Sequence, residues 1–172
     1  MTILYRSLLL IFCVFALAAC GKSPLEKDLE TYARLNKEMH EFAESTKATM
    51  AFRAKTERHR GGSPELDALM GLLEGSKRGL DRLKLQDPQV QEQVNRLSTA
   101  YGNWAKYLQE LKDNEGKREP DEQLEQEILA DITKAKSQVT NAQNTLIAMG
   151  KDEGIAITVP FVVCSAEDVD CK

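Results

Sequence analysis

The sequence predicts an all-α fold, an antiparallel up-down-up-down helical bundle followed by an extended C-terminal tail. Apolar residues recur at three- and four-residue steps in four successive segments, which is the spacing of one helix face. Gly, Ser, Asp and Pro residues separate these segments. From residue 155 to residue 163 every second side chain is instead large and apolar, which is the spacing of an extended strand.

The composition limits the function classes that need to be considered. The chain has 172 residues, 29% of them charged, and a formal net charge of -4. One domain is expected at this length. Wholesale nucleic-acid binding needs a strong basic excess, which this chain lacks, so no nucleic-acid partner is expected.

The N-terminus has the features of an export signal. Arg6 precedes an apolar run of twelve residues, Leu8 to Ala19. Such a run spans about 18 Å as a helix, whereas the hydrocarbon core of a membrane is about 30 Å thick. We therefore interpret residues 1–19 as a signal peptide that is removed, not as a membrane-spanning anchor.

The end of this run is Leu17-Ala18-Ala19-Cys20, followed by Gly21. The motif resembles the lipobox of bacterial lipoprotein precursors, and the resemblance covers residues 1–22. It implies cleavage before Cys20 and attachment of fatty acids such as palmitate to that residue. Gly rather than Asp after the cysteine implies the outer membrane. The resemblance thus implies a periplasm-facing protein anchored in the lipid bilayer through residues 20–24, a lipidated linker.

Two more cysteines, Cys164 and Cys171, remain in the mature chain. Disulfides persist in exported proteins, so this pair predicts a bridge that closes a small loop. Two free thiols or a metal-binding pair are the alternatives.

The helical bundle is predicted over residues 25–150. The first helix covers 25–60 and ends at Gly61-Gly62, where glycine favours a break. The second covers 64–86, with Ser63 as its cap and proline at its first position. Straight helices of these lengths would measure about 54 and 35 Å. We expect the surplus to form a stalk near the lipid, unless the first helix bends.

The third helix is predicted to start at Asp87-Pro88, and its apolar stripe runs from Val90 to Leu111. The apolar steps pass through Asp87, so one kinked helix over 64–113, and hence three helices in all, stays open. The fourth stripe runs from Leu124 to Met149 and is closed by Gly150. Short loops between helices favour antiparallel neighbours.

The tail, residues 151–172, contains one strand-like segment and the Cys164–Cys171 loop. A single strand cannot satisfy its own backbone hydrogen bonds, and Pro160 lacks an N–H. The tail therefore either packs on the bundle, clipped by the disulfide, or pairs with a partner.

A row of glycines is the first candidate for partner binding. Gly71, Gly75 and Gly79 recur at four-residue steps in the second predicted helix, although each glycine costs about 0.8–1 kcal/mol of helix propensity. Such a row, bordered by Leu72 and Arg78, lets another backbone approach closely. It predicts a groove for a partner helix or a second copy, unless a helix of the same bundle covers it.

Two other sets of residues are candidate partner contacts. Basic side chains gather at the loops far from the lipid, where they either complement a helix dipole or attract an acidic partner. In the tail, apolar side chains could contact a partner strand. The residues of the two sets are Arg53, Arg58, Arg60, Lys117 and Arg118, and Ile157 and Phe161.

Residues for catalysis or metal binding are scarce. His40 and His59 are the only histidines, and neither belongs to a recognisable nucleophile motif. The Glu-x-x-His spacing of di-iron bundles and glycine-rich phosphate loops are also missing from the sequence. We therefore expect no enzyme activity, no metal and no cofactor.

Together these features predict a lipid-anchored, periplasm-facing lipoprotein that binds another protein. A structural or assembly factor of the cell envelope or of a secretion apparatus, similar to pilotins in general plan, is the first interpretation. The alternative is an inhibitor or immunity lipoprotein that neutralises a periplasmic enzyme or toxin. The identity of the partner and the formation of a homodimer stay open.

Overall fold

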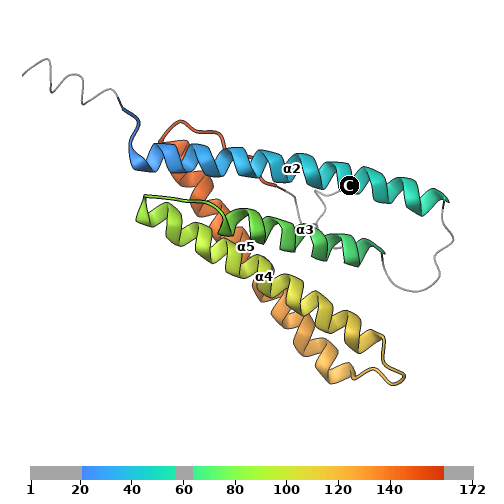
Figure 1. The fold of residues 1–172 in the computed structure, drawn as a ribbon. Helices are drawn as coiled ribbons and strands as arrows, with labels where there is room; N and C mark the ends of the chain where they lie inside the picture. The colour runs from blue at the N-terminus through green and yellow to red at the C-terminus, as the bar shows by residue number, and fades with distance from the viewer. Residues whose placement is uncertain (1–20, 57–63, 161–172) are drawn as a thin grey trace, which may run out of the picture.

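The computed structural model describes residues 21–56 and 64–160, apart from the side chains of 48–56 and 64. Within these ranges the chain is all-helical and has four helices and no strand (Figure 1), which confirms the predicted class and the helical bundle. The helices are α2 (Pro24–Thr56), α3 (Pro64–Asp81), α4 (Pro88–Glu115) and α5 (Glu122–Asp152).

The predicted break at Asp87 is confirmed, so residues 64–113 form two helices. The Asp87 backbone is extended, and its side chain accepts hydrogen bonds from the N–H groups of Gln89 and Val90, which caps α4. The predicted end of α3 at residue 86 is wrong, because the helix ends at Asp81. Residues 82–87 form a link whose Leu83 and Leu85 still pack against the core, which is why the apolar spacing continued past the helix.

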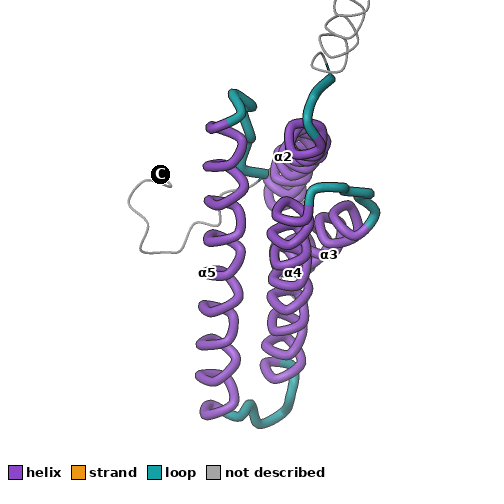
Figure 2. The backbone as a smooth tube through the Cα atoms, turned by 90° about the vertical axis from the view of Figure 1, so that its left-hand side faces the viewer, coloured by secondary structure: helices purple, strands orange, loops and turns teal. Residues whose placement is uncertain are grey.

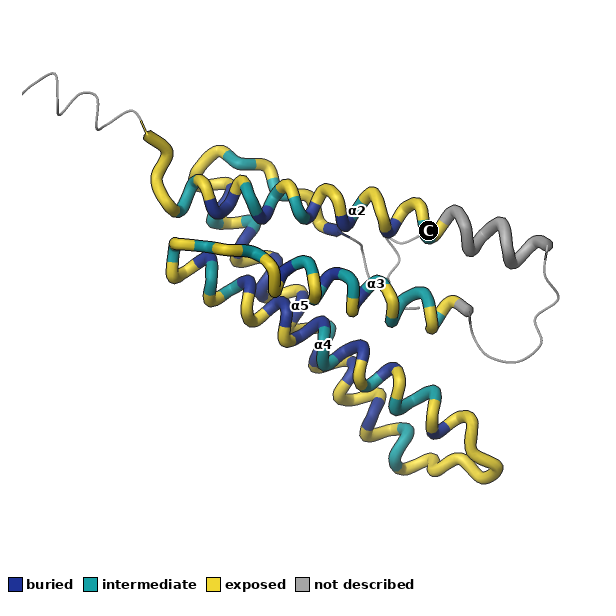
Figure 3. The backbone as a smooth tube through the Cα atoms, viewed as in Figure 1, coloured by how far each residue is buried: buried dark blue, intermediate teal, exposed yellow. Residues whose placement is uncertain are grey.

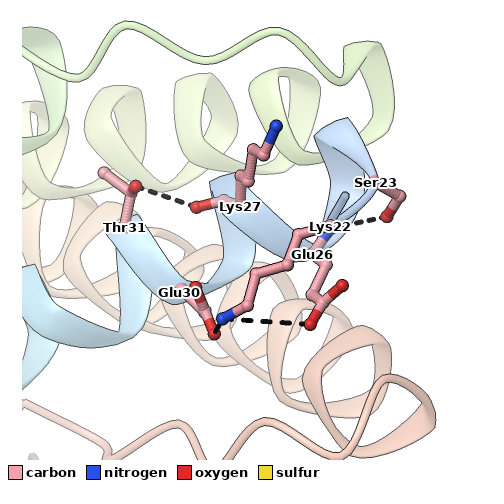
Figure 4. Close-up of polar contacts among 6 residues, drawn as sticks. All are labelled: Lys22, Ser23, Glu26, Lys27, Glu30 and Thr31. Atoms are coloured by element: carbon pink, nitrogen blue, oxygen red, sulfur yellow. Dashed lines mark hydrogen bonds and ion pairs between the residues drawn. The ribbon is translucent and has the colours of Figure 1, made fainter. Parts of the chain in front are cut away.

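The predicted stalk before the bundle is also wrong for the described residues. Helix α2 begins at Pro24, and Ser23 caps it by accepting the N–H of Glu26 at 3.0 Å (Figure 4). Leu29, in the second turn, is already fully buried. The start of α2 lies beside the link between α3 and α4, where Asp28 bonds Gln86 and Asp87.

Helix α4 lies at the centre of the packing. It pairs most extensively with α5 and then with α3, while α2 contacts the other three helices more sparsely. Figures 1 and 2 show α2 beside α3 and α4 beside α5, with the two pairs crossing at an angle. In Figure 3 the buried positions, drawn dark blue, recur along each helix between exposed positions, drawn yellow. The largest fully buried side chains are Trp104, Tyr32, Tyr101, Leu29, Leu73, Leu80, Leu97 and Leu146.

The end of α5 is set by Gly154, and the prediction that Gly150 closes this helix is wrong. Gly154 has φ of 72°, and the N–H of Ile155 bonds the carbonyl of Gly150 at 2.7 Å. The N–H of Gly154 bonds the carbonyl of Lys151 at 3.2 Å. This is the Schellman arrangement, which needs the left-handed conformation that glycine adopts without strain.

After this turn, residues 155–160 run back over the bundle beside α2 (Figures 1 and 2). Asn36 donates its amide N–H to the carbonyl of Thr158 at 3.0 Å, and His40 Nδ1 lies 3.1 Å from the carbonyl oxygen of Pro160. Ile155 and Ile157 pack against the core. These residues therefore take the packed alternative, whereas Cys164 and Cys171 lie outside the described residues.

Candidate partner-binding surfaces

The segment that precedes α2 is held against the helix. Lys22 pairs with Glu26 at 4.0 Å and donates a hydrogen bond to Glu30 (Figure 4). The hydrogen bond to Glu30 raises the pKa of Lys22. Cys20, the predicted lipid attachment residue, lies outside the described residues and precedes this segment directly.

A buried carboxylate fixes the link between α3 and α4. Asp28 is only 5% exposed and accepts the N–H groups of Gln86 at 2.5 Å and of Asp87 at 2.6 Å. Because Asp87 also caps α4, this contact ties the start of α2 to the start of α4. This role was not predicted from the sequence, although an acidic residue directly before Leu29 on the apolar face of the helix indicates it.

The structure divides the glycine row into a covered and an open part. A Cβ added at Gly79 would lie 3.2 Å from Leu35 Cδ1, so α2 covers this end. At Gly71 and Gly75 an added Cβ would meet no described atom within 4 Å. Arg78 is exposed and pairs with Glu74 at 3.5 Å. Two of the three glycines therefore have no packing role within the part of the chain that the structure describes.

An exposed aromatic ring on α2 lies at about the level of the two open glycines of α3. Phe42 is 60% exposed and follows Leu35 by seven residues, which puts the two on nearly the same face of α2. On α3, Leu72 precedes Gly79 by the same seven residues and is half-buried. We call Phe42, Gly71, Leu72 and Gly75 the α2–α3 strip.

The predicted basic tip is described only in part. The side chains of Arg53, Arg58 and Arg60 lie outside the described residues, and Arg118 is exposed. Lys117 donates to Asn114 Oδ1 at 3.1 Å, and Asn114 in turn holds the backbone of Asp121. Lys117 therefore helps to shape the connection between α4 and α5.

The two tail candidates are placed differently. Ile157 packs against the core, and its Cδ1 lies 2.6 Å from where a Cβ at Gly150 would be. Its side chain therefore serves internal packing and is a poor partner contact. Phe161 lies outside the described residues.

A groove between α4 and α5 that is lined mostly by polar residues, with a volume of about 610 Å³, was not identified from the sequence. We call it the amide groove because carboxamides are half of its lining. The lining residues are Glu92, Gln93, Asn95, Arg96, Thr99, Asn103, Gln138, Asn141, Ala142 and Thr145. Its signal in the sequence is the lack of charge over 97–105 and 137–150, in a chain that is 29% charged.

Other kinds of site find no support in the described part of the chain. No group of three or more His, Cys, Asp and Glu side chains there is placed to hold a metal ion. None of the described helices combines the length and apolar character needed to span a bilayer. No family model, curated protein or solved structure matches this chain. Its function must therefore be argued from its own residues.

Proposed function

We propose that this protein is a lipid-anchored, periplasm-facing component of the bacterial envelope that binds a protein partner as a structural or assembly factor. The observation that carries the proposal is the position of the lipobox cysteine, Cys20, which only three residues separate from Pro24 at the start of α2. Acyl chains on this cysteine would hold the protein at the bilayer, at about 0.8 kcal/mol for each buried CH₂.

In this proposal the helices alternate in direction as an up-down-up-down antiparallel bundle, and the Cys164–Cys171 bridge clips the tail. The contacts of Lys22 and Ser23 with α2 support a bundle that starts directly at the membrane. Phe42 follows Pro24 by 18 residues, so it lies about 27 Å along α2. The α2–α3 strip then faces the periplasm, away from the lipid.

The α2–α3 strip is the surface that we propose for the partner. Burial of an exposed phenylalanine by a partner stabilises the complex. The open glycines beside it allow a backbone or a helix to approach closely. The partner would therefore contribute a helix with an apolar face.

The anchor is tested by mass spectrometry of the N-terminal peptide from protein purified from bacterial membranes. We expect a peptide that begins with acylated Cys20, and release of the Cys20→Ser variant from the membrane fraction. Protein that retains residues 1–19, or that carries no fatty acid, would contradict the anchor.

The partner surface is tested by placing a photoreactive residue at position 42 in living cells. Leu129 on α5 is 38% exposed and serves as the matched control position. We expect a defined crosslinked protein from position 42 but not from 129. Gly75→Leu should abolish this crosslink by filling the strip, whereas Gly75→Ala should retain it. Equal crosslinking from both positions would refute the strip.

A further inference from the structure

We propose that the amide groove binds an extended, uncharged polypeptide segment through the backbone of that segment. This inference goes beyond the proposed function, since it concerns the opposite pair of helices and does not depend on lipid attachment. It rests on the chemistry of the lining, on the spacing of its polar groups and on a contact of the same geometry elsewhere in the molecule.

The lining offers the hydrogen-bonding groups that a peptide backbone needs. A carboxamide has an acceptor oxygen and N–H donors, as a peptide group does. Among the described residues, the side chains of Gln93, Asn103, Gln138 and Asn141 have no hydrogen-bond partner, although all four are at the surface of the groove. Asn95 accepts from Gln91 at 2.8 Å, which leaves its own N–H groups available. The groove therefore presents unused donors and acceptors from both helices.

The spacing of these groups matches an extended chain. Asn95, Thr99 and Asn103 follow one another at four-residue steps along α4, which is about 6 Å per step. An extended peptide repeats every two residues, or about 6.6 Å. Successive side chains on α4 can therefore meet successive peptide groups on one edge of such a segment. From residue 92 to residue 103 the groove is about 16 Å long, enough for about five extended residues.

The same register already holds the tail of this protein. Asn36 and His40, four residues apart on α2, bond the carbonyls of Thr158 and Pro160, which are two residues apart. The tail is neither helix nor strand there and runs beside α2. Side chains four residues apart on a helix of this fold therefore bond carbonyls two residues apart in a non-helical segment, which is the register that we assign to the amide groove.

The charge of the lining selects an uncharged segment. Glu92 and Arg96 pair with each other at 2.5 Å, and the other lining residues are neutral. A charged side chain buried against these groups would lose hydration without gaining a counter-charge. No aromatic residue lines the groove, so a sugar ring would find no flat apolar face on which to stack. A neutral peptide fits this chemistry better than a glycan does.

The test is an NMR titration of the isotope-labelled, full mature protein with a neutral probe peptide. The probe has about seven residues of serine, threonine and alanine with both ends blocked, so it can span the groove in extended form. We expect shifts of the backbone amides in 92–103 and 138–145. Replacing peptide bonds of the probe by esters should weaken binding about fivefold for each N–H that bonded the groove.

Matched variants distinguish the groove from other surfaces. Asn103→Ala and Asn141→Ala should each weaken binding of the probe about fivefold. Asn144→Ala should have no effect, because Asn144 is exposed on α5 but does not line the groove. Circular dichroism checks that all three variants keep their helix content. The inference is overturned if millimolar probe causes no shifts, or if the shifts lie elsewhere. It is equally overturned if a tetramer of N-acetylglucosamine binds the groove in place of the peptide.

Discussion

Individual buried polar residues stabilise the connections between the helices of this bundle. A buried carboxylate is costly unless hydrogen bonds compensate the lost hydration, and Asp28 obtains that compensation from two backbone N–H groups of the α3–α4 link. Asn114 does the same for the connection between α4 and α5, where it is 1% exposed and bonds Asp121. In both places a side chain replaces the backbone partner that a non-helical segment lacks.

Asp28→Ala should lower the free energy of unfolding by about 2 kcal/mol, because the link loses two charge-assisted hydrogen bonds. Asp28→Asn retains an acceptor oxygen and should lose less. Urea unfolding followed by circular dichroism measures both, with Asp131→Ala, an exposed position on α5, as the control. If Asp28→Ala and the control were equally stable, the proposed tie between α2 and α4 would be wrong.

The carboxylate of Asp81 gives the fold a pH dependence. Hydrogen bonds from Lys77 and then from Ser98 hold the pKa of Asp81 below its usual value of about 3.9. The folded state therefore favours the ionised form. Its stabilising contribution is complete above the unfolded pKa and is lost as the pH falls through the folded pKa. An NMR titration of Asp81 should give a higher pKa in Lys77→Met than in the unmodified protein. An unchanged pKa would show that Lys77 has no effect.

At the scale of the helices, the glycines of α3 contrast with the rest of the bundle. The helix could hold alanine at positions 71 and 75, since no described atom comes within 4 Å of an added Cβ. Retaining glycine there sacrifices helix propensity for a flat, open surface. At position 79 the proximity of Leu35 gives glycine a packing role.

Gly71→Ala and Gly75→Ala should each raise the free energy of unfolding by about 1 kcal/mol. Gly79→Ala should gain less, because Leu35 must shift to admit the new methyl group. Thermal unfolding of the three variants provides the comparison. A loss of stability in Gly71→Ala or Gly75→Ala would mean that another segment covers these positions.

Helix boundaries show how much could be predicted from the sequence. Asp87 and Pro88 predicted the start of α4, because capping depends on the residues at the boundary itself. The end of α3 could not be predicted, since Leu83 keeps the apolar spacing while lying in a non-helical link that packs on the same core. The amide groove was missed for a related reason. Its lining comes from α4 and α5, and the apolar stripe of each helix does not show with which other helix it pairs.

For the whole molecule, the tail links α5 with α2. Helices α2 and α5 contact each other sparsely, and residues 155–160 join them through Ile155, Ile157 and the hydrogen bonds from Asn36 and His40. Gly150 makes this path available, because a side chain there would occupy the place of Ile157. The choice between Gly150 and Gly154 as the end of α5 could not be made from the sequence, since it depends on where the tail crosses.

Gly150→Ala should displace the tail, since its Cβ would come within 2.8 Å of the backbone oxygen of Ile155. We expect a loss of about 1–3 kcal/mol in the free energy of unfolding, as for other overpacked positions. Hydrogen exchange should become faster at Ile155, whose N–H bonds Gly150. Ala148→Gly, at an exposed position of the same helix, controls for the effect of glycine content on α5. Unchanged exchange at Ile155 would contradict the predicted displacement.

The docking of the tail through its carbonyls has a consequence for how this protein evolves. Every amino acid carries the oxygen that Asn36 requires at position 158, so the Thr158 side chain, which is exposed, is free to drift, and so is that of Ala156. Gly150 and Ile157 share one space and can change only together. The sequences of divergent orthologues should therefore vary at alternate tail positions and conserve this pair.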